Sequence, residues 1–199
     1  MNIVFDVGRV LVHWEPEPVL ADILGGEEAL AAFQAEVDFM EWHKEQDRGR
    51  SPEAAVAAAR EQYPAYAEAL GALYDRWVET IPGAIEGSVE ILERLRAAEM
   101  PLYAITNFPA EQWVKTVPVF PFLGQFRDVV VSGKERMMKP DPAIYHVLLD
   151  RNGLVAEDCL FIDDSVANVD AARAVGMAAI HFTEPDALAD ALKDRGLLT

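Results

Sequence analysis

The stretch IVFDVGRVLV, residues 3–12, begins as a buried strand and then places a carboxylate where the apolar run should continue. Residues 3–5 are all apolar, which is typical of a strand in a protein core. Asp6 follows directly, and Gly8 comes two residues later. Because an unpaired carboxylate is costly to bury, a charge at the end of a core strand requires a compensating partner or a chemical role. Asp6 is therefore a candidate functional residue.

The composition limits the class of protein and its partners. The chain has 199 residues, with 17 basic and 34 acidic side chains and a formal net charge of −17. Because such an acidic surface repels nucleic-acid phosphates and anionic lipid headgroups, we expect neither nucleic acid nor a membrane as a partner. No apolar run approaches the roughly 18 residues of a membrane helix, and no signal-peptide pattern opens the chain. The single cysteine, Cys159, excludes an internal disulfide, so we expect a cytoplasmic protein. We expect a monomer or a homodimer.

Hydrophobic periodicity divides the chain into two kinds of structure. Residues 14–82 have apolar side chains at helical spacing, and Ser51-Pro52 is typical of a helix start. After residue 82, apolar strand-like runs alternate with single amphipathic helices, which predicts an α/β fold with a doubly wound, Rossmann-like parallel sheet. The predicted organisation is an α/β core of residues 1–13 and 83–199 with an all-helical cap inserted at 14–82. The expected strands after the first are 101–107, 126–132, 158–164 and 177–182.

Polar side chains recur where the predicted strands end. Ligands of open parallel sheets bind outside the carboxyl ends of the strands, so these groups are expected to converge below the helical insertion. Clustered carboxylates raise one another's pKa, so the cluster requires positive charge from a lysine and from a hard cation such as Mg²⁺. A carboxylate can also attack phosphorus and form an acyl-phosphate. The convergent residues are Asp6, Thr106, Asn107, Lys139, Asp163 and Asp164.

Four stretches resemble, in order, the four motifs of the haloacid dehalogenase-like hydrolase superfamily. The insertion is similar to that superfamily's first type of cap. The stretches are FDVGRVLV, ITN, KPDPAIY and FIDDSVANVDAARAVGM.

The resemblance also implies a role for each motif residue. Asp6 would be the nucleophile, and Mg²⁺ would bind Asp6, the backbone carbonyl of Gly8 and Asp164. Asp163 would lie beside the metal, as a further ligand or as support. Without a Cβ, Gly8 is expected to let the backbone bend in towards the metal. Thr106 and Asn107 would hold the phosphoryl oxygens, while Lys139 would orient Asp6 and offset developing charge.

One motif position departs from the usual pattern. Most phosphatases of the superfamily carry a second Asp where this chain has Gly8, as a general acid and base that is typically worth 10²–10⁴-fold in rate. A branch with a similar first motif resembles bacterial sugar-phosphate phosphatases that act on glucose 1-phosphate. In such an enzyme water, a good leaving group or a cap residue would cover proton transfer, with His13 and His43 as candidates.

Two other functions remain open beside a Mg²⁺ phosphatase acting on a small anionic phosphate monoester. A 2-haloacid dehalogenase would use Asp6 on carbon without metal, and Lys139 and Tyr145 would suit it. A catalytically silent member would bind a phosphometabolite or a protein partner. The acidic pair Asp163-Asp164 favours the phosphatase, because without a metal the pair would repel an anionic haloacid.

Several cap residues have simpler interpretations. The charged stretch HKEQDRGR, residues 43–50, is typical of a solvated helix end, although Arg48 or Arg50 would suit an anionic substrate. Trp14, Trp42 and Trp77 are expected to pack the cap.

Overall fold

The sheet of this computed structural model, which describes residues 1–198, has five parallel strands in the order β3-β2-β1-β4-β5. The first strand is central, and later strands are added outward on each side of it. This arrangement confirms the predicted doubly wound α/β fold. The strands are β1 (Asn2–Phe5), β2 (Leu102–Thr106), β3 (Val129–Val131), β4 (Cys159–Asp163) and β5 (Ala178–His181).

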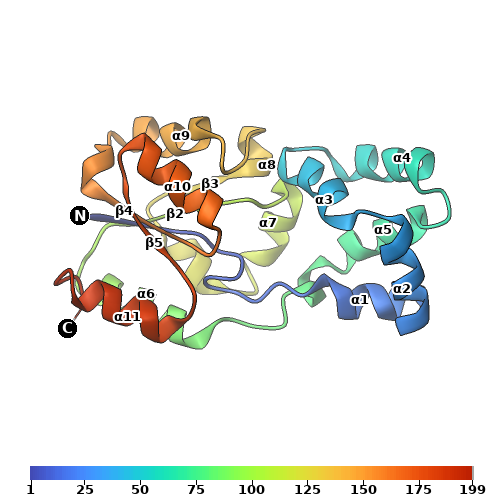
Figure 1. The fold of residues 1–199 in the computed structure, drawn as a ribbon, viewed down its shortest axis with the longest axis horizontal. Coiled ribbons are helices and arrows are strands. Elements are labelled where there is room, and N and C mark those ends of the chain that lie inside the picture. Colours follow the sequence, from blue (N-terminus) through green and yellow to red (C-terminus); the bar gives the residue numbers. More distant parts are fainter. Residues whose placement is uncertain (199) are drawn as a thin grey trace.

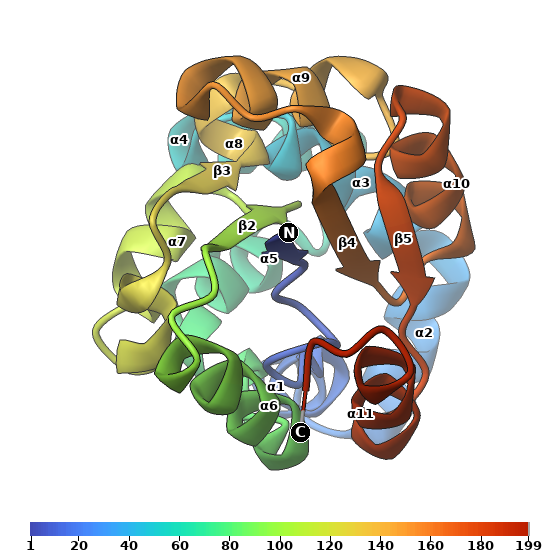
Figure 2. The ribbon, with the colours of Figure 1, turned by 90° about the vertical axis from the view of Figure 1, so that its left-hand side faces the viewer.

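Helices cover both faces of the sheet (Figure 1). Alternate residues of β1 enter two different apolar clusters, because successive side chains of a strand point to opposite faces. Phe5 packs in the cluster that contains residues of α6 and α11, and Val4 packs in the cluster that contains residues of α9 and α10. Figure 2 shows the sheet between these two pairs. They are α6 (Glu86–Ala97), α11 (Pro185–Lys193), α9 (Pro142–Asn152) and α10 (Val166–Val175).

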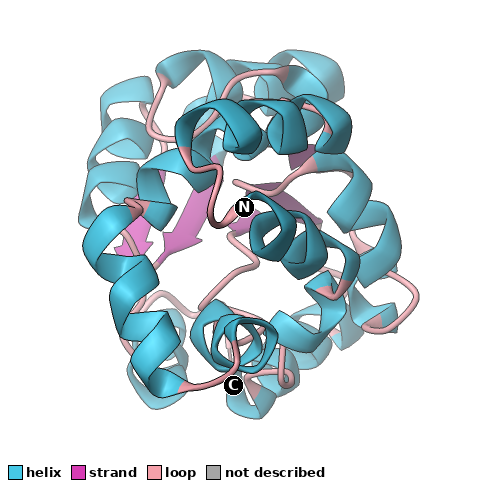
Figure 3. Ribbon diagram, turned by 90° about the vertical axis from the view of Figure 1, so that its right-hand side faces the viewer, coloured by secondary structure: helices cyan, strands magenta, loops and turns pink. Residues whose placement is uncertain are grey.

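The segment between β1 and α6 is helical and lies beyond one end of the sheet. Seen from that end, helices face the viewer and the strands lie behind them (Figure 3). Ser51 caps α4 as predicted, since its side chain accepts a hydrogen bond from the Ala54 backbone N–H. Within residues 1–198, no helix is long and apolar enough to span a bilayer. The inserted helices are α1 (Pro16–Leu24), α2 (Glu27–Glu36), α3 (Phe39–Asp47), α4 (Pro52–Gln62), α5 (Ala67–Asp75) and the 3-10 helix η1 (Trp77–Thr80).

Short helices complete the core at the edge that faces the insertion. They are α7 (Ala110–Thr116) and α8 (Ser132–Glu135), while the 3-10 helices η2 (Pro121–Gln125) and η3 (Ala156–Asp158) precede β3 and β4 in the chain. Both α7 and α8 follow the carboxyl ends of strands, β2 and β3 respectively. They therefore stand between the sheet and the inserted helices (Figure 1).

The strand register sets Asp6 beside Asp163. In β1, Phe5 pairs with Ile162 of β4, and the Asp6 backbone N–H donates to the Ile162 carbonyl at 2.8 Å. Both acidic residues therefore follow the same paired residues at the carboxyl edge of the sheet. On the other side of β1, Phe5 pairs with Ala104 of β2.

The end of α3 contacts the core through two glycines. Gly49 has a φ of 95°, and a Cβ added there would lie 2.7 Å from the Gly133 carbonyl oxygen of α8. Gly133 is equally confined, since a Cβ added to it would lie 2.5 Å from the Ala110 backbone nitrogen. The missing side chain of Gly49 thus lets the inserted helices approach α8, and that of Gly133 lets α8 approach the start of α7 within the core.

We expect Gly49→Ala to destabilise the protein more than Gly25→Ala, which is a matched control. Gly25 has the same φ of 95°, but a Cβ there would meet nothing within 4 Å, so the control measures backbone strain alone. The additional overlap at Gly49 is expected to lower the free energy of unfolding by a further ~1–3 kcal/mol. Urea denaturation of both variants tests this, and equal losses would contradict the close contact.

Candidate active site at the carboxyl edge of the sheet

A buried lysine joins two of the predicted carboxylates. The Lys139 ammonium lies 2.8 Å from Asp6 Oδ1 and 2.6 Å from Asp163 Oδ2. Carboxylate oxygens of Asp6, Asp163 and Asp164 lie within 4.8 Å of one another. Lys139 is 1% exposed and Asp163 is 0% exposed, so water screens these charges poorly. The structure therefore brings together four residues that the sequence placed at separate strand ends.

The protein itself satisfies both oxygens of Asp163. Oδ1 accepts hydrogen bonds from the Ser165 backbone N–H at 2.8 Å and from Asn168 Nδ2 at 3.0 Å. Oδ2 accepts from Lys139 at 2.6 Å and from Asn168 Nδ2 at 3.1 Å. Within residues 1–198, the hydrogen bonds and ion pairs of the Asp6 carboxylate involve Oδ1, which contacts Lys139 and accepts from the Val7 N–H at 2.6 Å. Asp6 Oδ2 and the half-buried Asp164 carboxylate are thus better placed than Asp163 to bind a ligand.

The cluster carries more negative than positive charge. Burial raises the pKa of Asp6, Lys139 opposes the increase, and the charge of Asp163 adds to it. Burial and the charge of Asp163 likewise raise the pKa of Asp164. Burial lowers the pKa of Lys139, but the charges of Asp163 and Asp6 outweigh this and raise it overall. Because one ammonium faces three carboxylates, the donor set suits a divalent cation with oxygen ligands.

Asn107 fixes the backbone of Lys139. Asn107 Oδ1 accepts from the Lys139 N–H at 2.9 Å, and Asn107 Nδ2 donates to the Lys139 carbonyl at 3.0 Å. The Thr106 hydroxyl is buried and has no hydrogen-bond partner within residues 1–198. Thr106 therefore has a hydroxyl available, whereas the Asn107 amide is mostly engaged in holding the lysine.

The loop after β1 corrects the expected reason for Gly8. In this loop Arg9, with a φ of 60°, takes the left-handed conformation, and a Cβ added at Gly8 would meet nothing within 4 Å. The loop is closed by hydrogen bonds from Arg9 N to Val12 O at 2.7 Å and from Leu11 N to Val7 O at 2.8 Å. The expectation that the backbone bends because Gly8 lacks a Cβ is therefore wrong. Position 8 instead leaves open space beside Asp6.

A cavity of about 750 Å³ separates the carboxylate cluster from the inserted helices. This volume lies in the range of small-molecule binding sites. Its core side includes Asp6, Gly8, Asn107, Lys139 and Asp164, and its helical side includes Trp14, Met40, His43, Asp47, Arg48 and Trp77. Arg9, Lys44 and Arg136 add further positive charge to the wall.

The structure separates the candidate proton-transfer and substrate residues. His43 and Arg48 line this cavity, as the sequence allowed. His13 is exposed and lines a different cavity of about 390 Å³. Arg50 lies over the Trp42 ring, 5.3 Å from its centroid, and its guanidinium donates to the Trp42 carbonyl.

Tyr145, which would suit a dehalogenase, is buried in the core. Its hydroxyl donates to the Asn168 carbonyl at 2.8 Å. The cavity above Asp6 is lined by other residues. Tyr145 therefore supports the helix that carries Asn168.

The expectation of a solvated helix end at residues 43–50 is wrong for three residues. His43 is 5% exposed, Gln46 is 2% exposed and Asp47 is 6% exposed. Together with the buried Trp42 they occupy positions i, i+1, i+4 and i+5, which form one face of α3. That spacing is present in the sequence, but the charged side chains obscured it. Sequence reasoning consequently missed Asp47 as a cavity residue.

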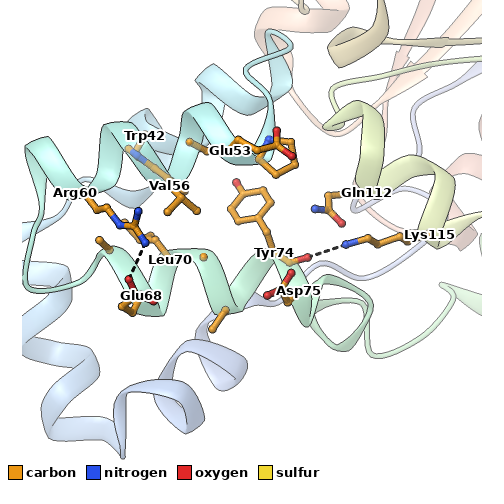
Figure 4. A pocket seen from close by; sticks show the side chains of 15 residues that line it. Trp42, Glu53, Val56, Arg60, Glu68, Leu70, Tyr74, Asp75, Gln112 and Lys115 are labelled. Carbon is orange, nitrogen blue, oxygen red and sulfur yellow. Dashed lines mark hydrogen bonds and ion pairs between the residues drawn. The ribbon is translucent and has the colours of Figure 1, made fainter.

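A second cavity, of about 540 Å³, lies between α4, α5 and α7 and holds none of the acidic cluster. Figure 4 shows Tyr74 and Gln112 directed into it and Lys115 reaching the Tyr74 backbone carbonyl, at 3.4 Å. Its walls come mostly from the inserted helices. The chemistry of the carboxylate cluster therefore belongs to the other cavity.

The fold and this cluster agree with comparisons against known proteins. A family model described as haloacid dehalogenase-like hydrolase matches residues 2–176. Since the match covers most of the chain, the protein belongs to this family of hydrolases.

Two individual relatives share about a third of their residues or fewer with this chain over the matched segments. A flavin mononucleotide hydrolase from Arabidopsis thaliana is 32% identical over 117 residues, covering 57% of this chain and 46% of that protein. A phosphoglycolate phosphatase from Pectobacterium atrosepticum is 26% identical, covering 97% of this chain and 89% of that protein. The chain spans about half the length of several curated relatives that it matches: the matches cover 46%, 54% and 50% of three of them. A family enzyme from Bacteroides thetaiotaomicron, solved as its magnesium complex, shares the fold with a TM-score of 0.70 and 22% identity, covering 92% of this chain and 93% of that chain.

We expect Lys139→Met to destabilise the protein strongly at neutral pH. The substitution leaves Asp6 and Asp163 buried without their ammonium, a loss that typically costs ~3–5 kcal/mol. The exposed Lys193, which pairs with Asp190 at 2.9 Å, provides the control Lys193→Met with an expected loss below ~1 kcal/mol. Urea unfolding in the presence of a chelator measures both, and similar losses would contradict the role of Lys139.

Asp47→Asn is expected to stabilise the protein as the pH rises. Burial raises the pKa of Asp47 from 3.8 to about 7, although Lys139 and Arg48 lower it. Because the folded state holds this proton more tightly than the unfolded state, Asp47 favours folding at low pH and opposes it once the pH passes its raised pKa. The advantage of the variant should therefore grow between about pH 4 and pH 7, by a few kcal/mol at most. Thermal unfolding at pH 5 and pH 8 measures it, and a constant difference would refute the prediction.

Proposed function

We propose that this protein is a Mg²⁺-dependent phosphatase that hydrolyses a small, anionic phosphate monoester through an aspartyl-phosphate on Asp6. The observation that carries the proposal is the cluster of three carboxylates within 4.8 Å of one another, two of them bound to Lys139, with Asp6 and Asp164 lining the cavity below the inserted helices. The names of the relatives support it, since they include a flavin mononucleotide hydrolase and phosphoglycolate and 6-phosphogluconate phosphatases.

The residues present fit a Mg²⁺ ion. Asp6, the Gly8 carbonyl and Asp164 would hold it, and Asp163, whose oxygens are satisfied by the protein, would support the site. When bound, Mg²⁺ neutralises charge on the phosphoryl oxygens and on the carboxylates. The excess negative charge of the cluster is the feature that calls for such an ion.

The remaining steps follow from the side chains. Lys139 holds Oδ1 of Asp6, which leaves Oδ2 to attack phosphorus and displace the leaving alcohol. The Thr106 hydroxyl, buried and unpartnered, is available to donate to a phosphoryl oxygen, and Asn107 keeps Lys139 in place. Water then cleaves the aspartyl-phosphate and restores Asp6.

The inserted segment, residues 14–82, acts in this proposal as a cap on a core formed by 1–13 and 83–199. It closes the cavity above Asp6 and limits the access of bulk water. Arg9, Arg48 and Arg136 line that cavity and favour a substrate with negative charge beyond the ester phosphate itself. A sugar phosphate is the substrate class we propose, and its hydroxyls would meet the polar cap residues.

The proposal predicts Mg²⁺-dependent release of phosphate from sugar phosphates and p-nitrophenyl phosphate. Both a chelator and Asp6→Asn should abolish it, the substitution by more than about 10³-fold because it removes the nucleophile. Asp75→Asn, at an exposed position of α5, should leave the rate unchanged. Phosphate release is measured in parallel with halide release from 2-chloropropionate. Metal-independent halide release would identify a dehalogenase, and the absence of any turnover would identify a silent binder.

A further inference from the structure

Hydrolysis of a phosphate ester requires a proton for the leaving oxygen, and Gly8 offers no side chain next to Asp6. Among the cavity residues, arginine and lysine stay charged at neutral pH and make poor proton donors. Burial lowers the pKa of His43 to about 3, so its imidazole is neutral. The three clustered carboxylates are engaged with Lys139 or available to the metal. Asp47 is the acidic residue of the cap side of the cavity, and no other role in the structure accounts for it.

We propose that Asp47 is the general acid and base of the reaction: it protonates the leaving oxygen and then takes a proton from the attacking water. The inference rests on the proposed phosphatase activity and adds to it a catalytic residue from the cap. Asp47 is the last residue of α3 and lines the same cavity as Asp6.

Burial and hydrogen bonding support this role. Asp47 is 6% exposed, and its Oδ1 has no hydrogen-bond partner within residues 1–198. A buried carboxyl oxygen without a partner is costly to the fold, so it calls for a ligand or a functional reason. A substrate oxygen in the cavity would supply the missing partner.

The neighbours of Asp47 hold it in a defined position. His43 Nε2 lies 3.5 Å from Asp47 Oδ1, and the His43 ring stacks against both Trp14 and Trp77, with centroids 5.0 Å and 5.6 Å away. Gln46 Nε2 donates to the Tyr74 hydroxyl at 3.3 Å, so that hydroxyl is free to donate its own proton to His43 Nδ1. The remaining imidazole N–H is then at Nε2, which lies beside Asp47 Oδ1 without forming a hydrogen bond to it.

The contact between the cap and the core fixes the end of α3. Gly49, two residues after Asp47, lies against the Gly133 carbonyl of α8. Lys139 follows α8 in the chain and is close enough to Asp47 to lower its pKa. Asp47 therefore lines the same cavity as the lysine that binds Asp6.

The proton balance is complete without a further reactant. In the first step Asp6 Oδ2 forms a bond to phosphorus, the ester P–O bond breaks, and the Asp47 carboxyl gives its proton to the leaving oxygen. In the second step water forms a bond to phosphorus, its proton passes to Asp47, and the bond between phosphorus and Asp6 breaks. Inorganic phosphate leaves, and both carboxyl groups return to their starting states.

The electrostatic surroundings suit both steps. Burial raises the pKa of Asp47 to about 7, with Lys139 and Arg48 opposing, so protonated and ionised forms are both populated near neutrality. A group with a pKa near the working pH serves best as acid and base. The charged or titratable groups that line this cavity or act on Asp47 from beside it are Asp6, Arg9, His43, Lys44, Arg48, Tyr74, Arg136, Lys139, Asp141 and Asp164.

Two phenyl esters of similar shape test the assignment with Asp47→Asn. Phenyl phosphate has a poor leaving group that needs a proton, whereas p-nitrophenolate leaves without one. We expect kcat/KM to fall by about 10²-fold or more for phenyl phosphate and by less than about 10-fold for p-nitrophenyl phosphate. We also expect a burst of p-nitrophenol in the variant, because loss of the base slows hydrolysis of the aspartyl-phosphate. Asp75→Asn is the matched control and should behave as the wild type.

The other outcomes are equally decisive. Equal losses with both esters would overturn the role of Asp47 as an acid and show that it only shapes the pocket, and no loss would overturn it as well. If Asp47→Asn does not fold, the pH dependence of the wild-type enzyme decides. Its kcat/KM for phenyl phosphate should fall above about pH 7 relative to its kcat/KM for p-nitrophenyl phosphate, and a constant ratio of the two would overturn the role of Asp47. A wild-type protein without phosphatase activity would overturn the proposed function itself, before Asp47 is tested.

Discussion

The charge imbalance around Lys139 is the constraint on which the rest of the structure depends. One buried ammonium contacts Asp6 and Asp163, and Asp164 adds a third carboxylate nearby. The parallel register brings the acidic residues together, while Asn107 holds the lysine backbone in place. Such a cluster is costly to bury and therefore unsuited to a purely structural role. A divalent cation would offset the negative charge that the single ammonium leaves uncompensated.

The inserted helices place polar side chains in the wall of the cavity as well as covering it. The inner face of α3 carries polar residues, and aromatic rings from the loop before α1 and from η1 hold His43 in place. The close contact between Gly49 and Gly133 sets this face against the core. The geometry therefore depends on the packing of the insertion as much as on the sheet.

The fold and most of the core site could be predicted from the sequence, because parallel strands must end at one edge. Asp6, Lys139 and Asp163 were placed together for that reason alone. Asp47 could not be found in the same way, since it is buried in a cavity whose other walls come from residues that are distant in sequence. Likewise, nothing local shows that Asn107 hydrogen-bonds the Lys139 backbone or that Arg9, rather than Gly8, adopts a positive φ.

The central claim is that Asp6 becomes covalently phosphorylated. Mixing the protein with Mg²⁺ and acetyl phosphate, quenching in acid and analysing the peptides by mass spectrometry tests it most directly. The account predicts the added mass of one phosphoryl group on the peptide that contains Asp6, and its absence when Mg²⁺ is withheld. Phosphate release by an active enzyme with no modified peptide, or with the phosphoryl group on another residue, would contradict it.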